Sequence, residues 1–179
     1  MNALRNFYFL RAAAAFAWVA AVLLSSPGPA ALAGTLLVLY PAWDALANVL
    51  DARRSGGLQA NPGQTFNALV SAVTAVAMAI AFALHGNPGG VLVFGAWALL
   101  AGLFQLAVGI RRRKLGGQVF MMLSGAQSAL AGVFFIVQSF GAAPTLAQLA
   151  PYAGFGGLYF LLSALWLSLR KPRPAPSTS

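Results

Sequence analysis

The only two acidic side chains of this 179-residue chain lie in one short stretch, "YPAWDALANVLDARR", at residues 40–54. If the stretch is an α-helix, its spacing places Tyr40, Asp44, Asn48 and Asp51 on a single face. Carboxylates and an amide on one face could bind a cation, relay a proton or form an ion pair. Cysteine is absent, so disulfides and thiolate chemistry are excluded. What the two carboxylates do therefore depends on which groups the other segments bring to them.

The rest of the chain is strongly apolar, with 60% hydrophobic and 7% charged residues, where a soluble domain carries about 25% charged residues. An α-helix needs about 20 apolar residues to cross a hydrocarbon core of about 30 Å. Stretches such as "AAAAFAWVAAVLL" lack the alternation of a membrane β-barrel. The sequence predicts an all-α membrane protein with six transmembrane helices, in the apolar runs at about 7–24, 30–50, 66–84, 90–110, 118–140 and 149–169.

The basic residues predict how these helices cross the membrane. The connections "SSPGPA", "HGNPGG" and "GAAPTLAQLAP" contain no Lys or Arg, whereas the chain ends and the other two connections contain all 11. The positive-inside rule then places both termini and the basic loops in the cytoplasm of a bacterial inner membrane. These clusters suit contacts with anionic lipid headgroups, and "RRRK" at 111–114 is the candidate for a more specific lipid or protein docking site. The net charge of +9 is broken up by long apolar runs, so nucleic-acid binding is not expected.

A basic connection follows every second apolar run, which predicts three helical hairpin repeats at about 7–50, 66–110 and 118–169. Together they form a single domain, residues 1–170, followed by a short cytoplasmic Pro/Ser-rich tail at 171–179. A shift of 59 residues aligns Gly95 with Gly154. The N-terminus also imitates a signal peptide with a cleavage site at 31–33. Because the apolar run continues through Tyr40, we expect the first helix to be retained.

Counting from the outer turns predicts which polar side chains share a depth. The first turn centres near Gly28, so Arg11 and Asp44 are almost equally far from it and should lie side by side, roughly 25 Å from that turn. The same count for the other hairpins predicts an intramembrane polar layer around Asp44 and Asn48, comprising Arg11, Asp44, Asn48, Ser71, Gln105 and Gln127. Charges inside a membrane face the bundle interior and pair. The layer is therefore either a structural ion-pair network or a polar cavity or proton relay in which Asp44 titrates.

The remaining polar residues suggest local roles. Asp51 adjoins Arg53 and Arg54, which predicts an interfacial ion pair. The small residues Ser124, Ser128 and Gly132 recur every fourth position, which favours close packing of helices. Pro41 removes the hydrogen bond to the carbonyl of Leu37, and a polar neighbour could satisfy that oxygen. The lone His85 is expected to be an exposed end-of-helix residue, with a pH sensor as the alternative.

No catalytic, cofactor-binding or metal-binding motif is recognisable, so an enzyme is not expected. The stretches "YPAWDALANVLDARR", "VFGAWALLAGLFQLAVGIRRRK" and "LSGAQSALAGVFFIVQSF" resemble the HdeD-like short-repeat family of bacterial inner-membrane proteins. The likeness covers about residues 10–170 and implies six helices in a domain of unknown function, whose founding member is associated with acid resistance. It transfers no catalytic or ligand-binding residues.

Two functions are expected from these observations. The first is a non-enzymatic inner-membrane protein, stress-related or an accessory subunit of a membrane complex, with a protein partner or a second copy as candidate companion. The alternative is a small transporter or proton-coupled channel that uses the Asp44-centred layer. The environment of Asp44 distinguishes them, because a water-accessible cavity favours transport and a dry, paired carboxylate favours a structural role.

Overall fold

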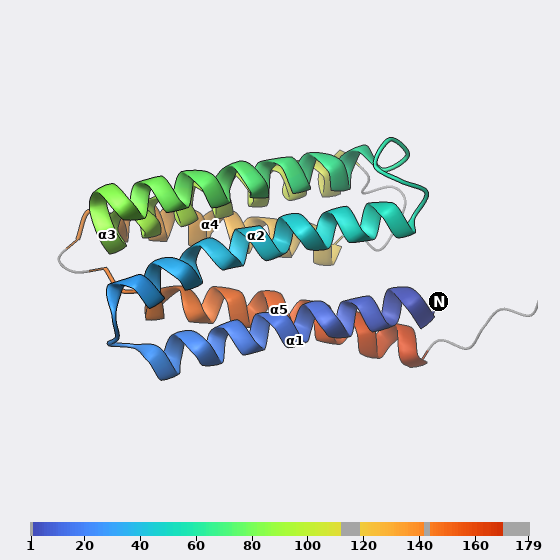
Figure 1. The fold of residues 1–179 in the computed structure, drawn as a ribbon. Helices are drawn as coiled ribbons and strands as arrows, with labels where there is room; N and C mark the ends of the chain where they lie inside the picture. The colour runs from blue at the N-terminus through green and yellow to red at the C-terminus, as the bar shows by residue number, and fades with distance from the viewer. Residues whose placement is uncertain (1, 112–118, 142–143, 170–179) are drawn as a thin grey trace, which may run out of the picture.

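The computed structural model describes residues 2–111, 119–141 and 144–169, and every regular element in these ranges is helical. The tail at 171–179 and the basic residues at 112–114 lie outside the described residues. Five long helices form an elongated bundle (Figure 1), in which a 3₁₀ turn at Leu146–Leu149 precedes the last helix. They are α1 (Asn2–Ser25), α2 (Ala30–Arg54), α3 (Pro62–Arg111), α4 (Val119–Ser139) and α5 (Ala150–Leu169).

The prediction of six separate helices is wrong as a count, because α3 contains both predicted runs, 66–84 and 90–110. Within α3 only Gly86 departs from helical geometry, with φ 62° and ψ −145°. There the helix turns back on itself. The rings of Phe66 and Phe104 lie 5.3 Å apart, whereas 38 residues of straight helix would separate them by roughly 57 Å. α3 is therefore two antiparallel arms, 62–85 and 87–111, joined at Gly86.

The reversal at Gly86 is explained by local residue types. Its φ/ψ region is open essentially to glycine alone. Pro88 follows in the first turn of the second arm, where its missing N–H costs no helical hydrogen bond. A Cβ at Gly89 would collide with the backbone oxygen of Ala81, so a glycine there lets the arms meet closely.

The two arms of α3 form the predicted hairpin at 66–110, whereas the predicted hairpins at 7–50 and 118–169 are not closely packed helix pairs. The closest packing joins α2 to α3, α3 to α4, and α1 to α5. α1 packs only sparsely on α2, its neighbour in sequence. Figure 1 shows α1 and α5 side by side on one side of the bundle, with the N-terminus and the end of α5 at the same end. Against α1, a Cβ at Gly157 would lie 3.1 Å from the Cβ of Ala15, so small residues permit this pair.

The second arm of α3 and α4 approach most closely, along a row of glycines. Gly95 faces Gly132, and Gly102 faces Gly125, so both helices carry glycines seven residues apart. A Cβ at Gly95 would lie 2.8 Å from the backbone nitrogen of Ile136, and one at Gly125 would lie 2.7 Å from that of Leu106. The backbones are therefore in direct contact, the packing mode of small residues between membrane helices. Gly154, the repeat partner predicted for Gly95, has nothing within 4 Å of a Cβ position. Gly95 therefore permits close helix packing, and Gly154 does not.

Large aromatic side chains fill the space between the α1/α5 pair and the other helices. Tyr40 contacts the rings of Trp18, Phe94 and Trp97, with ring centroids 4.7 to 5.9 Å apart. Phe94 also contacts Tyr152 on α5 at 5.5 Å. Long side chains thus bridge α1 to α2 and to α3, which explains why the α1 and α2 backbones stay apart while their side chains meet.

The surface of the bundle is apolar where a soluble protein would be polar. Leu24, Leu84, Leu130, Phe140 and Leu169 are each at least 70% exposed. A soluble monomer rarely exposes apolar area on this scale, whereas lipid covers it without cost. Five helices of the described chain are long and apolar enough to cross a membrane, so the fold is compatible with a multi-pass membrane protein.

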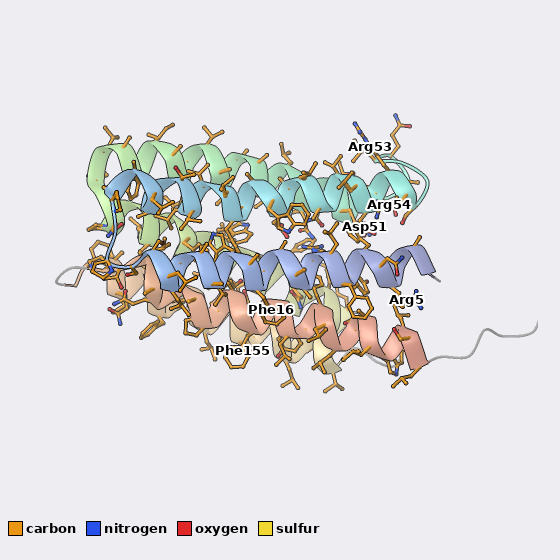
Figure 2. The ribbon with its side chains drawn as sticks, turned by 60° about the horizontal axis from the view of Figure 1, so that its bottom comes forward. Arg5, Phe16, Asp51, Arg53, Arg54 and Phe155 are labelled. Carbon is orange, nitrogen blue, oxygen red and sulfur yellow. The ribbon has the colours of Figure 1, made fainter. Side chains whose placement is uncertain are left out.

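The two ends of the bundle differ in charge. Figure 2 shows Arg5, Asp51, Arg53 and Arg54 together at one end. At the opposite end the uncharged connections meet around a small cavity of about 120 Å³, whose lining includes Pro27, Gly28, Asn87, Thr145 and Leu146.

Candidate functional site: a buried ion pair at Asp44

Asp44 accepts hydrogen bonds from three helices, and the predicted pairing with Arg11 is confirmed. Arg11 of α1 donates from Nη2 to Oδ1 of Asp44 at 2.5 Å. Ser71 of α3 donates from Oγ to Oδ2 at 2.8 Å, and Asn48, one turn along α2, donates from Nδ2 to Oδ2 at 3.0 Å. The same Asn48 amide reaches the backbone oxygen of Asp44 at 2.8 Å. Both carboxylate oxygens are thus engaged, and four of the six predicted layer residues come together.

The Arg11 guanidinium lies between the carboxylate and an aromatic ring. Its Cζ is 4.1 Å from the ring centroid of Phe160 on α5, a cation–π contact. The Arg11 and Asp44 side chains are only 13% and 24% exposed. Nε of Arg11 is buried and has no hydrogen-bond partner among the described residues. The site is therefore a compact ion pair with limited access to the surroundings.

The helices hold these side chains in place through a second contact about two turns away. Trp18 of α1 donates from Nε1 to the backbone oxygen of Leu36 at 2.7 Å. Sequence reasoning expected the carbonyl of Leu37 to need a partner, because Pro41 cannot bond to it. α2 stays helical through Pro41, and the acceptor is the adjacent carbonyl. Together with Arg11–Asp44, this hydrogen bond fixes α1 against α2 at two levels.

The predicted polar layer divides in two at α4. Oε1 of Gln127 accepts a hydrogen bond from Tyr159 of α5 at 2.9 Å, and no described contact joins it to Asp44. Neighbouring Ser128 donates to the backbone oxygen of Ala98 at 2.9 Å and lies 2.8 Å from the hydroxyl of Tyr152. These side chains form a second polar cluster, which links α3, α4 and α5.

Gln105 does not lie at the predicted depth. In the two arms of α3, Ala81 faces Gly89 and Phe66 faces Phe104, so the numbers of facing residues add up to about 170. The residue facing Ser71 is then Leu99, and Gln105 lies six residues, or about 9 Å, nearer the basic end. The prediction failed because it centred the turn at Asn87 and Pro88, whereas the facing residues of the two arms are centred near residue 85.

The predicted interfacial ion pair of Asp51 with Arg53 and Arg54 is wrong. Within the described ranges, the one salt bridge is Arg11–Asp44. Asp51 instead accepts a long hydrogen bond of 3.5 Å from Gln64. Arg54 places its Cζ 5.1 Å from the ring centroid of Phe7 on α1, and Arg53 is exposed. Residues two apart on a helix do not face each other, which removes Arg53, and the Phe7 ring draws Arg54 away.

The predicted packing motif of Ser124, Ser128 and Gly132 is only partly in the helix contact. A Cβ at Gly132 would collide with the backbones of Leu99 and Gly95, and Ser128 bonds to the neighbouring arm. Ser124 is half-buried and makes no described contact of this kind. The packing roles of Gly95, Gly102 and Gly125 were missed, although the seven-residue spacings of Gly95 to Gly102 and of Gly125 to Gly132 are visible in the sequence.

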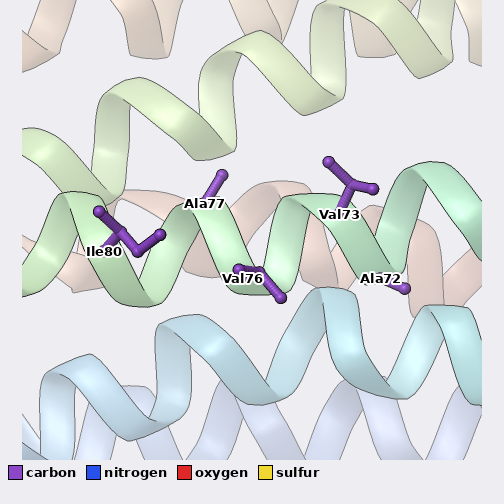
Figure 3. A pocket seen from close by; sticks show the side chains of 5 residues that line it. All are labelled: Ala72, Val73, Val76, Ala77 and Ile80. Carbon is purple, nitrogen blue, oxygen red and sulfur yellow. The ribbon is translucent and has the colours of Figure 1, made fainter.

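The pockets and the lone histidine of the described chain lie apart from the Asp44 site. A shallow apolar depression of about 410 Å³ lies on the first arm of α3. Figure 3 shows the five side chains that line it, Ala72, Val73, Val76, Ala77 and Ile80. Neither this depression nor the small cavity at the uncharged end is lined by Asp44. His85 is exposed, and across the described ranges no three His, Cys, Asp or Glu residues are grouped as metal ligands.

Aromatic residues were the main omission of the sequence reasoning. Phe160 and Trp18 complete the ion-pair site, and Tyr152 and Tyr159 complete the second cluster, yet only Tyr40 was singled out beforehand. Their signal was weak because aromatic residues in an apolar run look like lipid-facing side chains. Comparison with known proteins adds no further residue: the chain matches no protein-family model, no curated protein and no solved structure.

Proposed function

We propose that this chain is a non-enzymatic inner-membrane protein of bacteria, in which the Asp44 network is a structural clamp between α1 and the remaining helices. The observation that carries the proposal is the saturated carboxylate: three side chains donate to Asp44. A carboxylate so enclosed suits a fixed register of helices better than a passing substrate. The resemblance to HdeD-like sequences favours a stress-related protein or an accessory subunit of a membrane complex.

The proposed orientation has six crossings with both termini in the cytoplasm. Three features support it: α3 folds back at Gly86, Arg5, Arg53 and Arg54 share one end (Figure 2), and the uncharged connections meet at the other. Since the chain lacks cysteine, single cysteines report topology cleanly. Ser26→Cys should react with a membrane-impermeant maleimide in intact spheroplasts, and Ser55→Cys only after lysis. Labelling of Ser55→Cys in intact spheroplasts would refute the orientation.

A double-mutant cycle tests the clamp. Arg11→Gln and Asp44→Asn each leave a buried charge without its partner, which is strongly destabilising, while the double change removes both charges. We expect each single variant to unfold at a lower temperature than the double variant, with a coupling on the order of 1–3 kcal/mol. Additive effects of the two changes would contradict a structural clamp.

Transport is the second candidate function, and one observation favours it. Asp44 keeps 24% of its side-chain surface exposed, so an ion could reach its edge along the sparsely packed α1–α2 contact. Proteoliposomes containing a pH-sensitive dye provide the assay. A proton flux that Asp44→Asn abolishes, in a variant that folds and accumulates normally, would replace the clamp by a proton-coupled transporter.

A further inference from the structure

The Asp44 site can be viewed as a binding site whose walls come from α2, α3 and α5 and whose occupant comes from α1. Asp44 and Asn48 belong to α2, Ser71 to α3 and Phe160 to α5. α1 supplies Arg11, which lies in contact with both Asp44 and Phe160. Asp44, Asn48 and Ser71 are held by the packing of α2 on α3, independently of the arginine, whereas Phe160 reaches the site because α5 packs mainly on α1.

The contacts select a flat, delocalised cation. Ser71 and Asn48 occupy Oδ2 of Asp44 and leave Oδ1 directed at the guanidinium edge, where Nη2 donates at 2.5 Å. The ring of Phe160 covers the guanidinium, 4.1 Å from Cζ. An edge-on carboxylate with an aromatic face suits guanidinium, which is planar and weakly hydrated, better than a compact ammonium group.

The site makes no described hydrogen bond to the nitrogen through which the guanidinium is attached to the chain. Nε, the nitrogen that joins the group to the Arg11 side chain, is buried without a hydrogen-bond partner among the described residues. All described polar recognition is therefore at the free end of the group. A guanidinium ion that is not attached to α1 would make the same two contacts.

We infer that the Asp44 site is a binding site for guanidinium-type cations, which Arg11 fills as a tethered ligand and which a free guanidinium ion enters once the Arg11 side chain is removed. The inference rests on the ion pair that the proposed function also uses, and goes beyond it by assigning the ligand class. In the intact protein the tethered group excludes free cations, because an attached ligand has a high effective concentration.

Chemical rescue of the Arg11→Ala variant tests the inference. The variant is purified in detergent, and its apparent Tm is followed by tryptophan fluorescence in 0 to about 20 mM guanidinium chloride, with sodium chloride at equal concentration as reference. A ligand that binds only the folded state raises the Tm as its concentration exceeds the Kd. We expect a rise of at least about 2 °C, the shift that a chain of this size shows when the ligand concentration is roughly ten times the Kd. Wild type should show no rise.

Three controls make the outcome specific. Arg11→Ala combined with Asp44→Asn should lose the rescue, as should Arg11→Ala combined with Phe160→Leu, and n-propylammonium should rescue Arg11→Ala less than guanidinium does. If Arg11→Ala does not fold, cell-free synthesis into nanodiscs with and without guanidinium replaces the melting curve, and recovery of folded protein is the readout. Equal behaviour in guanidinium and sodium overturns the inference in either format. If the double-mutant cycle still shows coupling, the structural clamp survives that failure.

Discussion

Replacing Gly125 by alanine should force α3 and α4 apart. A Cβ at this position would lie 2.7 Å from the backbone nitrogen of Leu106 and 2.9 Å from the backbone oxygen of Gly102. The first distance is about 0.7 Å short of the 3.4 Å at which ordinary van der Waals contact begins, and backbone cannot rotate out of the way as a side chain can. Overpacking of this kind costs about 1–3 kcal/mol. Alanine returns up to about 1 kcal/mol through its higher helix propensity, so the net loss should be about 1–2 kcal/mol.

The matched control is Gly154→Ala in α5, where a Cβ would meet nothing within 4 Å. Only the propensity gain operates there, so this variant should be as stable as wild type or slightly more so. Thermal unfolding in detergent, followed by tryptophan fluorescence, should show Gly125→Ala about 2–8 °C below wild type and Gly154→Ala at or above it. If both variants melt together, direct backbone contact does not hold α3 to α4.

Three further substitutions test other parts of the structure, each by the same melting assay. Gly86→Ala should lower the free energy of unfolding by about 1–3 kcal/mol, because its φ of 62° and ψ of −145° strain any L side chain, while Gly63→Ala, in open space on the same helix, should not. Trp18→Phe deletes the donor to the Leu36 oxygen and should cost about 0.5–1.5 kcal/mol more than Trp97→Phe, whose ring packs against the same Tyr40 ring. Asp51→Asn should change stability by less than about 0.5 kcal/mol, since its described hydrogen-bond partner is Gln64 at 3.5 Å; a loss equal to that of Asp44→Asn would contradict a weak structural role for Asp51.

Helix positions and the depth of side chains near the first turn could be predicted by counting residues along the chain. Apolar run length indicated the helices, and equal distances from Gly28 paired Arg11 with Asp44 across 33 residues. The same method misplaced Gln105, because a turn centre wrong by only two or three residues doubles into an error of about six residues between facing arms. Depth counts are thus reliable only where glycine or proline marks the reversal unambiguously.

Counting residues could not predict which helices pack against each other. The hairpin prediction assumed that consecutive helices pack, yet α1 packs chiefly on α5. That choice depends on steric fit, with Gly157 receiving Ala15 and Phe16, while bulky Trp18 and Tyr40 hold α2 at a distance. Residue size indicates how closely two helices can approach but does not identify the partner, since several helices here carry suitable glycines.

The pairing of α1 with α5 imposes an order on biosynthesis. Gly157 is made long after Ala15, its contact on α1, a delay on the order of 10 to 30 s at usual translation rates. Asp44 becomes available much sooner, so the growing chain can neutralise Arg11 inside the membrane while the packing face of α1 still waits for its partner. A ribosome that stops before α5 would release a chain whose first helix is held only by its sparse contacts with α2, including Arg11–Asp44 and Trp18–Tyr40, because its main packing partner would be missing.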